Sequence, residues 1–435
     1  MMISTWHSNQ SQMPAVPGSL RYLNRLTILQ LLRAEGPISK ANLARISTIS
    51  PPTVSKVIDN LHANGLAEVV GTSTPSATGG KRARLYRFNS SAVRVGAVLM
   101  AVDGLSAAIC DGEADLILKA FRSFGANRSP KTVAAAIVAL LKELLGELSL
   151  TPRDLLGVGI GVPGLTDSAN GIVNFVPHLR GWRDVPLGRW LVDALQVPVL
   201  LDNESHVQAL AEYYRGQGSD CDSLICVETG IGLAAAFLFN GQLYRGAGNT
   251  AGEVGHMTIQ EDGPLCECGN RGCWEVLASI TWLANQARQA LQSGRQSSIP
   301  LLDEVKAQAA AVYAAALADD ALALELMSAH GRHFGIGIAN LINALNPRRI
   351  ILHGESVAGG LPFLRAILQT VQERTLKRPR EMVEIVFSDL GDDVGLIGAT
   401  SLVMEAFFHN ATYPANAIHT LPIGLQATFN ASARH

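Results

Sequence analysis

The first apolar pattern in the chain recurs at helical spacing and predicts short helices near the N-terminus. One leucine face ends at Gly36 and Pro37 and consists of Leu23, Leu26, Leu29 and Leu32. A second, shorter pattern contains Leu43 and Ala44, and Ser39 stands where it can cap the helix. These spacings predict two short helices.

A third helical pattern begins after Ser50. Pro51 suits the first turn of a helix, because the N–H that proline lacks has no partner there. Gly65 suits the left-handed residue that ends a helix. The buried face consists of Val54, Val57, Ile58 and Leu61. With that face in the core, the residues expected to read base edges in a DNA major groove are Ser50, Thr53, Ser55, Lys56 and Asn60.

Two strand patterns, 66–70 and 85–88, follow the helices and predict a hairpin. The loop between them is rich in Gly, Ser, Thr and Pro and ends in basic residues. Lys81, Arg82 and Arg84 are expected to contact phosphates or a minor groove. Three helices followed by a basic wing predict a winged helix-turn-helix domain. The alternative is a small protein-interaction module with a basic, solvated edge.

The body of the chain alternates strand patterns and helix patterns, with glycines at the joins. The strand patterns are 93–100, 107–110, 155–162, 197–201, 223–227, 233–239 and 349–352. The helix patterns are 132–148, 204–215, 281–292, 323–346 and 361–376. This order predicts an α/β architecture in which helices cover a mixed sheet.

Composition and charge narrow the class of protein. The 435 residues are 48% hydrophobic and 17% charged, which is typical of a globular protein of two or three domains. No apolar run approaches the ~18 residues that a membrane span needs, and the N-terminus does not resemble a secretory signal, so a cytoplasmic protein without membrane insertion is expected. Residues 1–90 carry a net charge of +7 and the remainder carries −9. A basic head on an acidic body favours binding of the head to a polyanion.

Three of the six cysteines fall within eight residues, which indicates a metal site rather than a disulfide framework. His256, Cys266, Cys268 and Cys273 follow the pattern H-x9-C-x-C-x4-C. One imidazole and three thiolates form a closed tetrahedral set for Zn²⁺, which is expected to be structural because no coordination position stays open. The alternative is a group of buried thiols without a metal.

The stretch from Gly248 to Glu275 resembles the ROK family of repressors, open reading frames and sugar kinases. The resemblance covers roughly residues 93–410, and the winged head matches the repressor branch. It implies an actin-like (hexokinase-like) fold of two α/β lobes with a sugar site between them. The residues that it assigns to sugar binding are Glu253, His256, Glu275, Asn203 and Glu204, with Glu204 in the place of the catalytic base.

These patterns together divide the chain. We expect a disordered tail (1–18), a winged helix-turn-helix domain (19–90) and a first lobe (91–202) that the C-terminal helix (395–410) joins. A second lobe with the zinc loop (203–394) and a C-terminal tail (411–435) complete the division.

The segments that hold phosphate in kinases of the family are altered here. Val98 and Met100 stand where the family has an acidic residue and a glycine turn, and an apolar loop does not hydrogen-bond phosphate. Glu228 precedes a Thr-Gly-x-Gly turn at a place where the family has a small residue. The chain is therefore expected not to be an enzyme.

The resulting prediction is a repressor of sugar-utilisation genes, or alternatively an activator, whose effector is a sugar or sugar phosphate. It is expected to bind a palindromic double-stranded DNA operator as a homodimer or homotetramer. Two other hypotheses stay open. One is control by a protein partner such as a transporter component, and the other is an active sugar kinase that also binds DNA.

Overall fold

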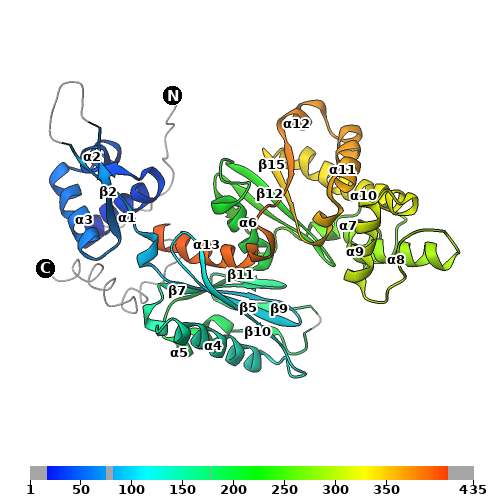
Figure 1. The fold of residues 1–435 in the computed structure, drawn as a ribbon, viewed down its shortest axis with the longest axis horizontal. Helices are drawn as coiled ribbons and strands as arrows, with labels where there is room; N and C mark the ends of the chain where they lie inside the picture. Colours follow the sequence, from blue (N-terminus) through cyan, green and yellow to red (C-terminus); the bar gives the residue numbers. More distant parts are fainter. Residues whose placement is uncertain (1–16, 75–81, 178, 410–435) are drawn as a thin grey trace.

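The computed structural model of the protein describes residues 17–74, 82–177 and 179–409. It consists of a small N-terminal head and two α/β lobes (Figure 1). Helix α1 begins at Pro17, so the expected disordered segment 1–18 extends two residues too far. The rest of that segment and the expected tail 411–435 lie outside the described residues. No helix within the described ranges is long and apolar enough to cross a membrane.

The head contains the three predicted helices and the predicted hairpin. Its elements are α1 (Pro17–Glu35), β1 (Ile38–Ser39), α2 (Lys40–Ser47), α3 (Pro51–Ala63), β2 (Ala67–Thr72) and β3 (Arg84–Phe88), with strand order β1-β3-β2. Ser39 caps α2 as predicted, because its side chain accepts a hydrogen bond from the N–H of Asn42. Gly65 has a φ of +77°, as the predicted helix end requires. Leu23 differs from the other leucines of its predicted face, since it is 52% exposed.

The first lobe is built on a five-stranded sheet of order β11-β7-β4-β5-β6. Its strands are β4 (Val95–Met100), β5 (Gly104–Cys110), β6 (Leu116–Ser123), β7 (Gly157–Val162) and β11 (Val199–Asn203). The strands β11, β7 and β4 are parallel, whereas β4, β5 and β6 are antiparallel. Helices α4 (Pro130–Glu147) and α5 (Leu187–Leu195) lie together below this sheet (Figure 1). A small sheet of β8 (Leu165–Asp167), β9 (Ile172–Phe175) and β10 (Arg183–Val185) follows β7.

The second lobe has a sheet of order β14-β13-β12-β15-β16. Its strands are β12 (Ser223–Thr229), β13 (Leu233–Phe239), β14 (Gln242–Tyr244), β15 (Arg349–His353) and β16 (Glu384–Phe387). Its helices are α7 (Trp274–Ala278), α8 (Ile280–Gln292), α9 (Val305–Leu317), α10 (Ala321–Leu345), α11 (Gly360–Arg374) and α12 (Lys377–Met382). The mixed sheets and their helices confirm the predicted α/β class.

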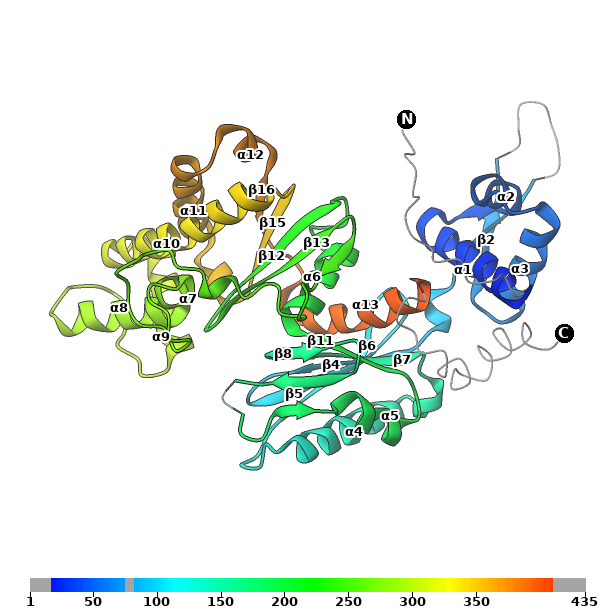
Figure 2. The ribbon, with the colours of Figure 1, turned by 180° about the vertical axis from the view of Figure 1, so that it is seen from behind.

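Two helices carry the chain between the lobes. It enters the second lobe through α6 (Glu204–Arg215) and returns through α13 (Val394–His409), which lies above the first-lobe sheet (Figure 2). A methyl group at Gly398 would lie 1.7 Å from the carbonyl oxygen of Val207 on α6. A methyl group at Gly159 on β7 would lie 1.8 Å from the carbonyl oxygen of Ala399 on α13. Glycine on both sides therefore lets α13 pack directly against backbone.

The head is joined to the body by packing as well as by the chain. One continuous hydrophobic cluster contains core residues of α1 and α3 together with the last turns of α13. The rings of Phe88 on β3 and Phe408 on α13 meet edge to face, with centroids 5.3 Å apart. Gln30 on α1 donates a hydrogen bond of 2.8 Å to the carbonyl oxygen of Phe408. The head is thus docked on α13 rather than tethered at a distance.

We expect Gly398→Ala to destabilise the fold by about 3 kcal/mol, because the added methyl group meets the backbone of α6, which cannot rotate away as a side chain can. The matched control is Gly146→Ala in the last turn of α4, where no atom lies within 4 Å of the new methyl group. That substitution is expected to be neutral or to stabilise by about 0.5–1 kcal/mol. Denaturant unfolding of both variants measures the difference, and equal midpoints would contradict the packing argument.

Candidate functional site

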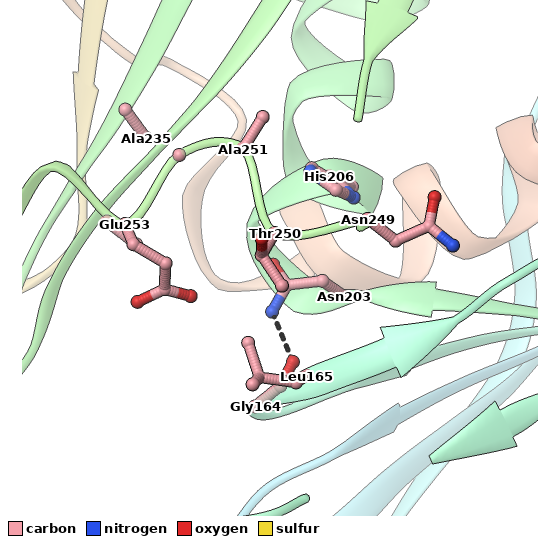
Figure 3. Close-up of a pocket in the computed structure, with 11 residues that line it drawn as sticks. Gly164, Leu165, Asn203, His206, Ala235, Asn249, Thr250, Ala251 and Glu253 are labelled. Atoms are coloured by element: carbon pink, nitrogen blue, oxygen red, sulfur yellow. Dashed lines mark hydrogen bonds between the residues drawn. The ribbon is translucent and has the colours of Figure 1, made fainter. Parts of the chain in front are cut away.

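A pocket lies where the chain passes from the first lobe to the second (Figure 3). The first lobe contributes residues after β7 and at the end of β11, and the second lobe contributes β13 and the loop after β14. The lining residues are Gly164, Leu165, Asn203, His206, Ala234, Ala235, Asn249, Thr250, Ala251, Gly252 and Glu253. A ligand in this pocket touches both lobes.

Asn203 was assigned to sugar binding, and it lines the pocket. It is the N-cap residue of α6, and its side-chain oxygen accepts a hydrogen bond of 2.8 Å from the N–H of Ser205. Its amide nitrogen donates to the carbonyl oxygen of Gly164, also at 2.8 Å (Figure 3). These two hydrogen bonds fix the orientation of the Asn203 amide at the N-terminus of α6.

A buried ionic network supports the pocket from behind. Asp202 is fully buried, and its two oxygens contact Nδ1 of His206 at 2.8 Å and the guanidinium of Arg245 at 2.7–2.9 Å. Burial alone would raise the pKa of Asp202, but the hydrogen bonds and charges of His206 and Arg245 outweigh it and lower that pKa. The network ties the end of β11 to α6 and to the loop that carries Glu253.

Sequence reasoning missed several of these residues. Asp202 and His206 flank the recognised Asn203-Glu204 pair, so their proximity to it was a usable signal. Arg245 precedes the recognised stretch, and Asn249 and Thr250 lie at its start, but their side chains carry no pattern that marks them. Only the folded loop brings them to the pocket.

Glu253 and Glu275 lie near each other but have different partners. Glu253 lines the pocket with a side chain that is 52% exposed, and its Oε2 is 4.0 Å from Nε2 of His256. Burial raises the pKa of Glu253, the charge of Glu275 adds to that rise, and the histidines nearby oppose it. Glu275, the second residue of α7, accepts a hydrogen bond of 2.9 Å from the N–H of Leu233. Glu275 thus contacts the turn before β13 and is not among the lining residues.

Glu204 is the first residue of α6 and lies behind Asn203, outside the lining of the pocket. Burial raises its pKa well above the usual value, and the charges of Glu228 and Glu355 raise it further. Ser205 donates a hydrogen bond of 2.9 Å to Oε2 of Glu228. The start of α6 therefore lies between the pocket, which Asn203 lines, and the carboxylates near the end of β12, to which Ser205 donates.

The four predicted metal ligands come together. The ligand atoms of His256, Cys266, Cys268 and Cys273 all lie within 4.8 Å of one another. Nδ1 of His256 is 3.7 Å from Sγ of Cys266, and the Sγ atoms of Cys268 and Cys273 are also 3.7 Å apart. A tetrahedral ion with ~2.3 Å bonds to sulfur separates two thiolates by about 3.8 Å. The donor set and its spacing fit such an ion.

Backbone and burial shape this metal cluster. Gly272 has a φ of +63°, and a methyl group there would lie 1.6 Å from the carbonyl oxygen of Gln260, so the loop requires glycine. Burial raises the pKa of the Cys273 thiol to about 12, so a cation is needed to hold it as a thiolate. The N–H of Asn270 lowers the pKa of the exposed Cys268 thiol.

The two ring nitrogens of His256 have different neighbours. Its Nδ1 points toward Cys266, and its Nε2 points toward Glu253 at the pocket. An ion held by Nδ1 would leave Nε2 as an N–H donor on the pocket side. One imidazole ring therefore links the metal cluster to the pocket.

The outer face of α3 carries most of the predicted base-reading residues. Ser50 and Thr53 are joined by a hydrogen bond of 2.8 Å, and Lys56 and Asn60 are exposed. Ser55 has other partners, since it accepts from Nζ of Lys40 at 3.0 Å and donates to Asp59 at 3.2 Å. Lys40 and Asp59 also form an ion pair of 2.5 Å.

The strands β2 and β3 form the predicted wing. The N–H of Ser73 donates to the carbonyl oxygen of Ala83 at 2.8 Å and so extends the hairpin beyond both strands. Arg82 and Arg84 are exposed there, and Lys81 lies outside the described residues. The exposed part of α3 and the wing together offer a basic and polar surface.

The apolar residues that replace the family's phosphate-binding residues lie at the end of β4. Val98 and Met100 are fully buried in the hydrophobic core of the first lobe, packed with residues of α4 and β7. These side chains therefore face the core and offer no polar atom to a ligand.

Comparison with known proteins agrees with this architecture. The model described as the ROK family matches residues 95–406, and the model described as the MarR family matches residues 22–78. A xylose repressor of Bacillus spizizenii is 30% identical over 388 residues, which cover 89% of this chain and 96% of that protein. The DNA-binding transcriptional dual regulator NagC of Escherichia coli is 29% identical over 404 residues, covering 90% of this chain and 94% of that protein.

Among solved structures, a ROK family transcriptional regulator, described as a homolog of the E. coli MLC protein, has a TM-score of 0.81 at 23% identity. The superposition covers 94% of this chain and 99% of that chain. It shows that this chain, with its head and both lobes, has the same overall fold as that regulator.

We expect the protein to carry about one metal ion per chain and Cys268→Ser to lose it, because three ligands hold an ion less tightly than four. Cys268 is exposed, so serine leaves no cavity, and a lower melting temperature would report the lost ion rather than lost packing. The control is Cys221→Ser, which lies outside the cluster. Elemental analysis by mass spectrometry measures the content, and an unchanged content would rule out this site.

Glu204→Gln tests the acidic surroundings of α6. The pKa of Glu204 is higher in the folded chain than its ordinary 4.5, so wild-type stability falls as the pH rises above about 4.5. Glutamine does not titrate, and the variant should therefore gain thermal stability over wild type as the pH rises above about 4.5, with no gain at lower pH. Exposed Glu381→Gln is the control. A pH-independent difference would contradict this account.

Proposed function

The chain belongs to the ROK family, and from that premise we propose that it is a transcriptional repressor whose binding to DNA is controlled by a sugar. Relatives that match nearly the whole chain are named as a xylose repressor and as a DNA-binding regulator. The genes under its control would be genes of sugar utilisation. The expected division into head, first lobe (91–202 with 395–410) and second lobe (203–394) is retained as part of this proposal.

The observation that carries the proposal is that α6 runs from the pocket to the head. At its first turn it presents Asn203 and His206 to the pocket. Near its last turn, the ring of Tyr214 lies 5.1 Å from the guanidinium of Arg33 on α1 of the head. The same guanidinium lies 4.7 Å from the ring of Phe408 on α13. One rigid helix thus touches both the effector pocket and the DNA-binding domain.

Arg33 is held between the two helices that connect the lobes. Burial lowers its pKa, while Tyr214, Glu113 and Glu405 act in the opposite direction. A guanidinium between two aromatic rings is favoured by cation–π attraction, which increases as water is excluded. Any change in the angle between α6 and α13 must alter this contact.

A sugar would act by favouring one arrangement of the lobes. It would contact Asn203 at the end of β11, the edge strand of the first-lobe sheet, and Glu253 in the second lobe, so it should bind more tightly when the lobes close. A ligand shifts a conformational equilibrium only by its difference in affinity for the two states. Closure would move α6 relative to α13 and reposition the head.

DNA would be bound by two heads related by symmetry. We assign α3 to the major groove, with Thr53, Lys56 and Asn60 toward the bases, and Arg82 and Arg84 to the phosphates or minor groove. A homodimer, or a tetramer of two dimers, would read a palindromic operator in the cytoplasm, where the operator DNA is.

The metal in this proposal is Zn²⁺ with a structural role. His256, Cys266, Cys268 and Cys273 would hold it, and when bound it supplies a fixed centre for a loop that otherwise has little core of its own. Fixing the ring of His256 also fixes the donor that faces Glu253. The pocket side of the loop is thereby ordered before a sugar arrives.

The protein is proposed to have no kinase activity. Phosphoryl transfer needs polar groups and a metal site at the phosphate, and Val98 and Met100 at the end of β4 are buried in the core. A coupled assay of ADP release with common hexoses tests this, and turnover would overturn it.

The function is tested by fluorescence anisotropy of the full-length protein on the DNA upstream of its own gene, with and without a panel of sugars. We expect tight, salt-sensitive binding that one or a few sugars weaken at least ten-fold. Sugar-independent binding would contradict sugar control, and no binding to any such fragment would contradict the repressor assignment.

Arg33→Ala tests the connection between pocket and head. We expect it to reduce the effect of the sugar on DNA affinity several-fold while calorimetry still detects sugar binding, because the sugar pocket does not contain Arg33. Arg84→Ala is the matched control, since it removes an exposed wing arginine. That variant should weaken DNA binding and its salt dependence but keep the response to sugar. An unchanged response in Arg33→Ala would contradict the role given to α6.

A further inference from the structure

The turn between β12 and β13 is surrounded by carboxylates from three different elements. Glu228 is the penultimate residue of β12, Glu275 comes from α7, and Glu355 begins the short 3-10 helix Glu355–Gly359 after β15. The turn itself, 229–233, has the Thr-Gly-x-Gly form whose backbone N–H groups can bind phosphate. The acidic groups therefore stand at a place that is suited to an anion.

One of these carboxylates lies directly on the turn. A methyl group built at Gly230 would lie 2.4 Å from Oε2 of Glu355, so this oxygen covers the open side of the glycine. The N–H of Gly230 already donates to the carbonyl oxygen of Gly232 at 3.1 Å, and the N–H of Leu233 donates to Glu275 at 2.9 Å. Protein groups thus occupy space and N–H groups that a phosphate would need.

The surroundings of this turn disfavour negative charge even after pairing. Lys306 on α9 faces it, with Nζ 2.6 Å from Oε1 of Glu355, and so balances one carboxylate. Glu204 and Glu228 remain, and the pKa of each is raised, mainly by burial and also by the charge of Glu355. A further anion placed here would meet the same repulsion at close range and low dielectric.

The acidic turn adjoins the pocket, because Ala234 lines the pocket and pairs with Glu228 across β12 and β13. Asn203 lines the pocket, Glu204 follows it at the start of α6, and Ser205 donates to Glu228 at 2.9 Å. A sugar in the pocket would therefore point any group on that side toward Glu204 and Glu228. A hydroxyl can donate a hydrogen bond to a carboxylate, whereas a phosphate dianion has no proton to donate and adds charge.

We propose that the effector is an uncharged monosaccharide without a phosphate group, and that Glu228 and Glu355 impose this choice. The inference rests on the proposed sugar control of the same pocket. The carboxylate of Glu355 takes the place of a bound anion at the turn 229–233. Glu228 repels a phosphate that approaches from the pocket. Phosphorylated sugars and nucleotides are excluded by the same two groups.

The test is calorimetric titration of the full-length protein with D-xylose, D-glucose and N-acetyl-D-glucosamine, each compared with its phosphate ester. For any sugar that binds, we expect the ester to bind at least about 100-fold more weakly. An ester that binds within ten-fold of its parent sugar overturns the choice of an uncharged effector but leaves sugar control intact. If neither sugars nor esters bind or change DNA affinity, sugar control itself fails, and this inference with it.

Glu355→Gln tests the residues. It removes the covering charge and leaves Lys306 without its partner, so the difference between sugar and ester should shrink about ten-fold or more. Inorganic phosphate should then raise the melting temperature of the variant but not of wild type. The control is Glu381→Gln on α12, an exposed glutamate that also pairs with a lysine, Lys377 at 3.9 Å. If Glu355→Gln and Glu381→Gln behave alike, Glu355 has no role in the selection.

Discussion

The position of α13 is set by backbone contacts, and the arrangement of lobes, pocket and head depends on it. Gly159 and Gly398 allow β7 on one side and α6 on the other to approach the helix more closely than any side chain would permit. Because proteins are packed to crystal-like density, such contacts leave little freedom for sliding. The crossing of α6 and α13 therefore fixes where these two helices meet.

The two ends of α6 lie at the pocket and at the head. Its N-terminal end is bound to the first lobe through Asn203 and to the second through the Asp202, His206 and Arg245 network. Its C-terminal end meets Arg33 of the head. A buried ion pair such as this one adds little net stability, but it fixes geometry because leaving any member unpaired is costly. Because the N-terminal end of α6 is held rigidly, a displacement of that end is transmitted to the contact with Arg33 at the other end.

Much of the fold was predictable because it follows from local pattern. The helix 204–215 was predicted to the residue. Of the predicted buried face of α3, Val54, Ile58 and Leu61 are buried and Val57 is partly buried. The metal ligands were predictable because their spacing within one loop already restricts the chemistry. Other elements escaped prediction. They include β8 to β10, whose strands have three or four residues and no clear alternation, and also the eight-residue β6 and the alanine-rich helix α9.

Residues that act only through tertiary contact were also missed, and for a physical reason. Arg245, Glu355 and Lys306 belong to loops and exposed helix positions that are far apart in the sequence, and nothing local distinguishes them from solvated charges. Ser55 shows the opposite error. Its type and position suited base reading, but Lys40 and Asp59 supply nearer partners.

The shared hydrophobic cluster of head and α13 has a consequence for modularity. Winged domains are often regarded as cassettes that evolution or an engineer can exchange between sensors. Here the winged domain has no complete boundary, since Phe407 and Phe408 at the end of α13 belong to the same core as Leu29 and Phe88. A new specificity for DNA would have to be inherited together with the last turns of α13, so that segments far apart in the sequence evolve as one unit.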